Sequence, residues 1–203
     1  MADSIESARS IGRIARVQVQ AESLKVAGTH FRRYDPAGLR EMAALVLEPG
    51  GVVGLAGDGT RVEDVHHAGH PVGKHRGSNG VSVGFTSHYV AMRDRFPHAL
   101  PPGEAGENIL IETTHAWRAE ELAGGVAIET VENGWATLEN IIVAEPCVEF
   151  ARHALRYPED ARPDRRVTDA LRDLGQGVRG FYATYHGEPV RIAPGARVAL
   201  LAE

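Results

Sequence analysis

The chain has 203 residues, a formal net charge of −5 and 43% hydrophobic residues. This length and composition suffice for one ordinary hydrophobic core, so we expect a single domain over 1–203. The 22 basic residues are scattered along an acidic chain, which does not favour the electrostatic attraction that nucleic-acid binding requires. We see neither a signal peptide nor the roughly 18 apolar residues of a membrane span. We therefore expect a cytoplasmic protein without nucleic-acid or membrane partners.

Alternating apolar and polar residues predict a strand over 11–20, after a few disordered residues within 1–10. A helix is expected over 35–49, because an aspartate and a proline suit its first turn, an apolar stripe follows at helical spacing, and a Pro-Gly pair ends it. A strand over 52–56 should come next.

The segment 64–80 is rich in Gly, His and Pro and lacks periodicity, which is typical of a long functional loop. The elements that follow are expected to be a strand, a helix, a loop, a strand and a helix, over 81–85, 86–96, 101–108, 109–112 and 115–122.

Asn133-Gly134 separates two apolar runs, 126–132 and 135–143, and predicts a β-hairpin with a type I′ turn. Helices and then strands should complete the chain, over 148–156, 167–174, 179–185, 190–192 and 198–201, with Gly175 as a left-handed helix cap. These patterns indicate an α+β fold that is mainly β: an antiparallel, barrel-like sheet with helices closing its ends.

Cys147 is the single cysteine, and it follows Pro146 where a long apolar strand gives way to a helix. Backbone N–H groups at a helix start favour a thiolate, which would make Cys147 a nucleophile and a soft metal ligand. Glu145 and Glu149 lie nearby and would oppose this effect. The alternative is a buried, inert cysteine, which is common among free cysteines.

Two further segments suit an anion. In 73–80, glycines can turn backbone N–H groups toward a phosphate, and Lys74 and Arg76 add positive charge. Arg179 stands between glycines at a strand start, where an arginine can clamp an anion or merely form a surface ion pair. Each segment alone is equally compatible with a solvated turn.

Three histidines and an aspartate crowd into one loop, at Asp64, His66, His67 and His70. They could bind zinc or iron, hydrogen-bond to shape a cleft, or simply lie on the surface. A histidine that faces Cys147 could act as its general base or ion-pair partner.

The order and spacing of these motifs resemble the MOSC family, named after the C-terminal part of molybdenum cofactor sulfurase. The residues that carry the resemblance are Lys74-His75-Arg76-Gly77, Gly103 to Asn108, Pro146-Cys147, Arg179 to Tyr182 and Pro194-Gly195. The resemblance implies a MOSC-like β-barrel that binds molybdenum cofactor or carries sulfur, with Cys147 as persulfide carrier or molybdenum ligand. The residues it implies for cofactor binding are Lys74, Arg76, Gly77, Asn79, Gly106, Glu107, Asn108 and Arg179.

Two enzyme classes follow from this resemblance, beside a non-catalytic delivery module. A molybdenum-cofactor oxidoreductase would act on a small substrate and need an electron-donor protein. A cofactor-free sulfur-transfer or C–S bond-cleaving enzyme would use Cys147 with the His66, His67 and His70 loop, with or without a metal. His67 and His75 are the other expected catalytic residues. Because no second thiol can resolve a persulfide internally, we also expect a sulfur-donor or acceptor protein.

Overall fold

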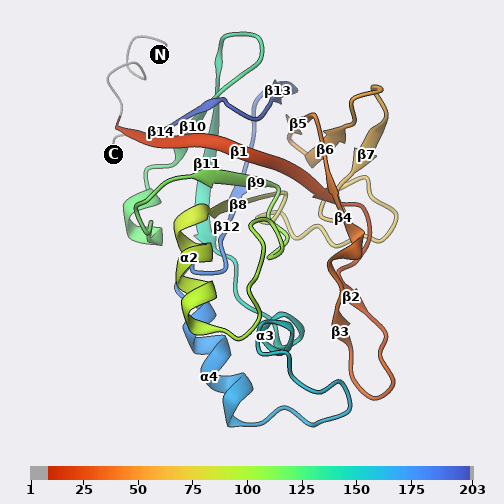
Figure 1. Cartoon of the computed structure of the whole chain (residues 1–203). Coiled ribbons are helices and arrows are strands. Elements are labelled where there is room, and N and C mark those ends of the chain that lie inside the picture. The colour runs from red at the N-terminus through yellow and green to blue at the C-terminus, as the bar shows by residue number, and fades with distance from the viewer. Residues whose placement is uncertain (1–8, 202–203) are drawn as a thin grey trace.

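The computed structural model describes residues 9–201. Its centre is a closed barrel of seven strands, and Figure 1 shows how they are arranged. The barrel strands are β1 (Ser10–Gln20), β8 (Val81–Phe85), β9 (Ile109–Glu112), β10 (Val126–Glu129), β11 (Trp135–Val143), β12 (Phe181–Thr184) and β14 (Arg197–Leu200). Their order is β14-β10-β11-β12-β8-β9-β1, and β1 closes the barrel by pairing with β14. The expected mainly β, barrel-like fold is confirmed.

Smaller β elements flank the barrel. β4 extends the pairing of β1, a four-stranded sheet has the order β13-β5-β6-β7, and β2 and β3 form a hairpin. Their bounds are β2 (Lys25–Val26), β3 (Arg33–Tyr34), β4 (Leu39–Glu41), β5 (Ala44–Glu48), β6 (Gly51–Leu55), β7 (Arg61–Glu63) and β13 (Val190–Ile192).

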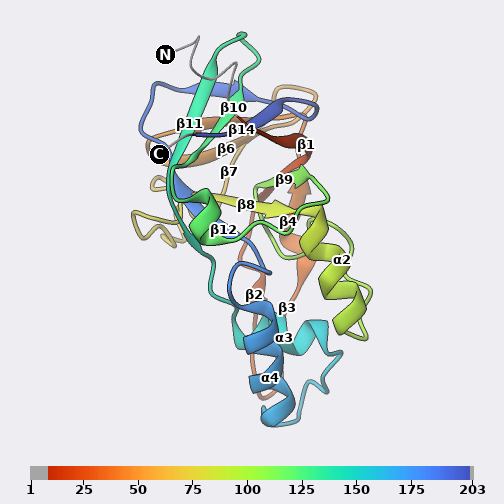
Figure 2. The ribbon, with the colours of Figure 1, turned by 90° about the vertical axis from the view of Figure 1, so that its left-hand side faces the viewer.

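Three helices gather at one end of the barrel, together with the β2–β3 hairpin (Figures 1 and 2). They are α2 (Thr86–Arg95), α3 (Val148–Ala154) and α4 (Arg165–Leu174), and two 3-10 turns are η1 (Pro36–Gly38) and η2 (Ala119–Leu122). The barrel interior holds one apolar core, and the helices pack around a second one that includes Tyr89, Phe150 and Leu174. None of the helices within the described residues is long and apolar enough to cross a membrane.

The helix expected over 35–49 is wrong. Asp35 does cap a helical turn by accepting a hydrogen bond from the Ala37 N–H, but the turn ends at Gly38. The apolar stripe instead belongs to strands, because β5 pairs with β6 on one side and β13 on the other and buries its central residues. A short continuous apolar run fits a buried strand as well as a helix. In this segment, pairing with two neighbouring strands makes it a strand.

Other local expectations need correction. The helix over 115–122 is reduced to η2, and the 133–134 hairpin has a five-residue loop instead of a type I′ turn. Asn133 alone in that loop adopts a positive φ, because the Thr130 hydroxyl accepts a hydrogen bond from the Gly134 N–H and widens the turn. Gly175 has a negative φ, and the left-handed residues follow it.

Three expectations about the whole fold also change. β8 and β9 pair in parallel, so the barrel is mixed, not wholly antiparallel. The helices cover one end of the barrel instead of both (Figure 1). For the disorder expected within 1–10, residues 1–8 lie outside the described residues, and Ser10 already pairs with Ala199 in the barrel.

Phe181 joins the barrel core to α2, since its fully buried ring contacts the rings of Phe85 and His88. We predict that Phe181→Ala lowers the free energy of unfolding by about 3–5 kcal/mol, because the deleted ring leaves a cavity. Urea denaturation followed by circular dichroism measures the change. Val90→Ala on the outer face of α2, where Val90 is 50% exposed, is the control and should change it by less than about 0.5 kcal/mol. Equal effects of the two substitutions would contradict the assignment of Phe181 to the core.

Candidate functional site

A cleft of about 590 Å³ opens where the 64–80 loop, the β2–β3 hairpin, the ends of β11 and β12, and the start of α3 meet. Cys147, His66, Lys74, His75, Arg76, Asn79 and Arg179 all line it. The fold therefore brings together residues that are more than 100 positions apart in sequence. Its size is within the range of small-molecule sites, about 300–1,000 Å³.

Cys147 is half-buried at the N-cap of α3, immediately after the chain leaves β11. Its thiol contacts the Glu149 carboxylate. Burial opposes ionisation of Glu149, but its own backbone N–H, the Lys25 ammonium and a hydrogen bond from Cys147 lower its pKa. Lys25 lies 3.7 Å from the Glu149 carboxylate. The Glu149 carboxylate beside the thiol thus forms an ion pair with Lys25.

Five basic side chains line the cleft, while Glu145 is the one carboxylate among the described lining residues. The five are Lys25, Arg32, Lys74, Arg76 and Arg179. Burial and then the charges of Arg32 and Lys25 lower the pKa of Lys74, whose ammonium donates to the Ser23 hydroxyl. The cleft is therefore electropositive although the whole chain carries a net charge of −5.

Arg179 is held rigidly at the base of this cleft. Its guanidinium donates to the Ala105 carbonyl at 3.1 Å and lies 5.6 Å from the centre of the Phe150 ring. Burial opposes its charge, but Tyr182, Tyr34 and Cys147 raise its pKa. Within the described residues its Nε is buried without a hydrogen-bond partner. A buried donor of this kind is available to an anionic ligand.

His66 is oriented by a buried carboxylate. Asp64 Oδ1 accepts hydrogen bonds from the His66 backbone N–H and ring Nδ1, at 2.9 and 2.8 Å. Because a carboxylate can only accept, Nδ1 donates in this pair, and Nε2 is the other nitrogen of a ring that lines the cleft. Asp64 also accepts from the Gln20 N–H and the Asn108 amide.

The other histidines of the loop diverge from this position. His67 pairs its Nε2 with Glu48 at 2.8 Å, and its Nδ1 accepts from the Gly69 N–H. His70 borders a separate surface hollow beside Glu48. His75 does line the cleft, with Nδ1 bonded to the His66 carbonyl. The structure therefore does not gather His66, His67 and His70 around one point.

Asn79 shapes the basic loop from within. Its amide oxygen accepts from the Arg76 N–H, and its amide nitrogen donates to the Lys74 carbonyl. Gly77 adopts φ +78° in the same loop but does not line the cleft. Asn79 therefore fixes the backbone that presents the two cationic side chains.

The Gly106-Glu107-Asn108 segment is buried beneath the cleft and does not line it. Gly106 adopts φ +89° at a position where a Cβ would meet Leu24 at 2.8 Å. Burial raises the pKa of Glu107, which accepts hydrogen bonds from the Tyr89 hydroxyl. These residues support the cleft from below instead of facing a ligand.

Asn108 connects this layer to the 64–80 loop. Its side-chain oxygen accepts from the Ser82 N–H and hydroxyl, and its amide donates to Asp64 at 2.8 Å. A continuous chain of hydrogen bonds thus runs from Ser82 through Asn108 and Asp64 to His66.

Sequence reasoning missed the contribution of the β2–β3 hairpin, which adds Lys25, Arg32 and Tyr34 to the cleft. Tyr182 also lines it, beside His66, with ring centres 6.3 Å apart. The cluster of basic residues over 25–33 was the one sequence feature that could have indicated this contribution, but it matches no motif.

Comparison with known proteins places the chain in a family. A family model described as the MOSC domain matches residues 64–199. No curated protein sequence matches the chain. Among solved structures, the YuaD protein from Bacillus subtilis is 15% identical with a TM-score of 0.51, over 94% of this chain and 93% of that one.

Two other solved structures are similar. YiiM from Geobacillus stearothermophilus is 14% identical with a TM-score of 0.50, over 94% of this chain and 75% of that one. A structure described as a hypothetical protein is 14% identical with a TM-score of 0.54, over 96% and 70%. At these identities the structures show a shared fold. Because the family model spans most of the chain, this protein belongs to the MOSC domain family.

Proposed function

We propose that the cleft binds the molybdenum cofactor, a pterin with a phosphate and a dithiolene. We propose further that the thiolate of Cys147 is the protein ligand to its molybdenum. The observation that carries this proposal is the position of the single thiol in one cleft with five cationic side chains. An anionic, sulfur-rich ligand matches both features, because cations attract its phosphate and a thiolate suits a soft metal.

The residues present fit such a group. Near Cys147, Arg179 has a buried Nε for which the described residues provide no hydrogen-bond partner. Lys74 and Arg76 extend from a loop in which Gly73 and Gly77 leave open space. Lys74 and Arg76 would hold the phosphate, and Arg179 would hold the end of the cofactor nearest Cys147. When bound, the cofactor supplies redox chemistry at molybdenum.

The chain's own residues would position the substrate and move protons. His66 presents an Nε2 lone pair that can accept a proton, while Asp64 stabilises the imidazolium that results. Burial raises the pKa of Tyr34, so its hydroxyl stays protonated and donates to the Glu104 carbonyl. We infer an oxidoreductase for a small oxygenated substrate, supplied with electrons by a partner protein.

A cofactor-free sulfur-transfer enzyme is the second candidate, and the Asp64–His66 pair favours it. His66 could remove the proton of Cys147. The thiolate would then attack the outer sulfur of a persulfide on a donor protein and release the donor as a thiolate, and an acceptor thiolate would in turn take that sulfur from Cys147. The two candidates differ in what the purified protein carries: molybdenum and pterin in the first, and a persulfide without molybdenum in the second.

We predict that Cys147→Ser abolishes molybdenum or sulfur loading and leaves the fold intact, because serine nearly matches the thiol in size but is not a soft ligand. Elemental analysis and intact mass, on wild type and variant purified anaerobically, measure the loading. Molybdenum lost with the cysteine supports the cofactor protein. An adduct of about 32 Da on wild type alone, without molybdenum, supports sulfur transfer. Equal molybdenum or sulfur loading of the two proteins would show that Cys147 neither ligates molybdenum nor carries sulfur.

We also predict that Arg76→Ala and Arg179→Ala each weaken cofactor binding by at least about 1 kcal/mol, since each deletes a charge-assisted hydrogen bond. The measurement is the molybdenum and pterin retained after dialysis against a series of salt concentrations. Arg93→Ala, an exposed arginine on α2 outside the cleft, is the control. Wild-type retention in both cleft variants would show that the phosphate lies elsewhere.

A further inference from the structure

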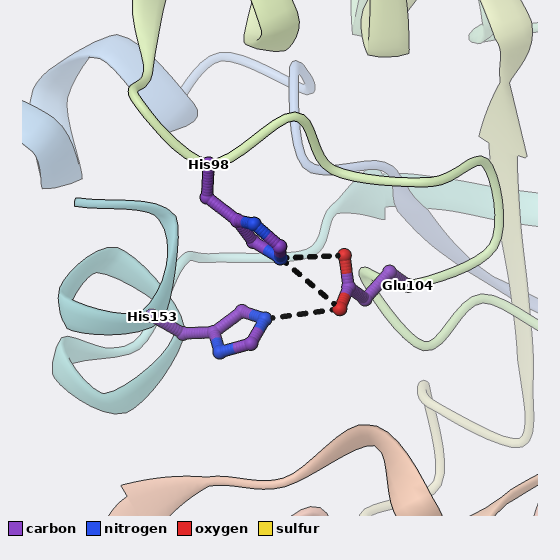
Figure 3. A group of neighbouring side chains, drawn as sticks. All are labelled: His98, Glu104 and His153. Carbon is purple, nitrogen blue, oxygen red and sulfur yellow. Dashed lines mark hydrogen bonds and ion pairs between the residues drawn. The ribbon is translucent and has the colours of Figure 1, made fainter. Parts of the chain in front are cut away.

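A second cluster of metal-ligand side chains lies outside the Cys147 cleft. His98 follows α2, Glu104 lies in the 101–108 loop, and His153 belongs to α3, and all three point toward one another (Figure 3). One ligand atom from each lies within 4.8 Å of the other two. This is the one such group found among the described residues, and sequence spacing gave no sign of it.

Both imidazoles direct the same ring nitrogen at one carboxylate. His98 Nε2 lies 3.2 and 3.1 Å from the two oxygens of Glu104, and His153 Nε2 lies 3.1 Å from Oε1. Ligands at zinc distances of about 2.0–2.1 Å in a tetrahedron are about 3.3 Å apart. Each imidazole nitrogen therefore already lies at nearly ligand spacing from the carboxylate, and all three ligand atoms are within 4.8 Å of one another.

The surroundings hold the cluster in place. The side chains of His98, Glu104 and His153 are 21%, 12% and 21% exposed. The His98 N–H donates to the Ala154 carbonyl, and the Tyr34 hydroxyl donates to the Glu104 carbonyl.

A cavity borders the two histidines of the cluster. A cavity of about 230 Å³ is bordered by both His98 and His153, and by Arg33, Arg152 and Arg156. Within the described residues, His98 Nδ1 is buried without a hydrogen-bond partner. A metal at Nε2 would displace the proton that Nε2 shares with Glu104, and the ring proton would then sit on Nδ1. A metal there would have two histidines, one carboxylate and positions left for water, a combination that zinc favours.

We propose that His98, Glu104 and His153 bind one zinc ion, or a similar divalent transition metal, beside the arginine-lined cavity. This site is separate from the Cys147 cleft, and it connects α3 to the loop that supports that cleft. The opposing interpretation is a purely structural pair of His–Glu hydrogen bonds without metal affinity.

The test is zinc binding by isothermal titration calorimetry, after chelator treatment, in a Cys147→Ser background that removes the thiol as a competing ligand. We expect one zinc per chain. His98→Gln, Glu104→Gln and His153→Gln should each weaken binding by more than about tenfold, the lower end of what even outer-shell partners of metal ligands contribute. His115→Gln, which removes the histidine of an exposed His–Glu pair at 2.8 Å, is the matched control and should bind as before.

A second measurement avoids any dependence on variant folding. Ring ¹⁵N spectra of the unmutated chain should show zinc-induced shifts at Nε2 of His98 and His153. Cobalt in place of zinc should give a visible spectrum of nitrogen and oxygen ligands without thiolate charge transfer. Failure of the Cys147→Ser protein to bind zinc, or zinc-induced shifts confined to other histidines, would overturn the proposal.

Discussion

The buried carboxylate of Asp64 is the interaction on which the functional end of the barrel depends. Its side chain is fully buried and accepts hydrogen bonds from the Gln20 N–H, the Asn108 amide, and both the backbone and ring of His66. A buried carboxylate without such partners would cost several kcal/mol, on the order of a broken ion pair. Strand β1, the 64–80 loop and the 101–108 loop are thus held in one arrangement by a single group.

This arrangement explains how an acidic chain maintains an electropositive cleft. The five cations come from the β2–β3 hairpin, the 64–80 loop and the start of β12, so no single segment is strongly basic. They approach one another because the loops beneath them are fixed by buried polar contacts. In low-dielectric surroundings their combined field acts on a ligand more strongly than it would in water. Net charge therefore says little about what this cleft attracts.

The sequence was most informative where a pattern depends on local geometry. Alternation identified the strand over 11–20, the helix after Thr86 was found from its apolar residues, and the motifs around Arg76, Cys147 and Arg179 indicated residues that do share a cleft. The sequence pattern was misleading where strand pairing determines the secondary structure. The apolar run of β5 forms a strand because it pairs with β6 and β13.

Side-chain direction was the other limit. The three histidines of the 64–80 loop allowed a metal site, cleft-shaping hydrogen bonds or surface positions, and in the structure His67 turns to Glu48 instead of the cleft. The His98–Glu104–His153 cluster joins residues up to 55 positions apart and depends on where α3 packs. Spacing along the chain contains neither kind of information, because both follow from tertiary contacts.

The closure of the barrel also has a consequence for biosynthesis. Strand β1 lies between β9 and β14, and Arg13 additionally donates to the Gly195 carbonyl, 182 positions later. The edge of β1 that pairs with β14 therefore stays unpaired until β14, the last described strand, has been synthesised. Long-range pairing of this kind slows folding and exposes strand edges in the meantime. The nascent chain should accordingly depend on chaperones during translation more than the mature barrel does.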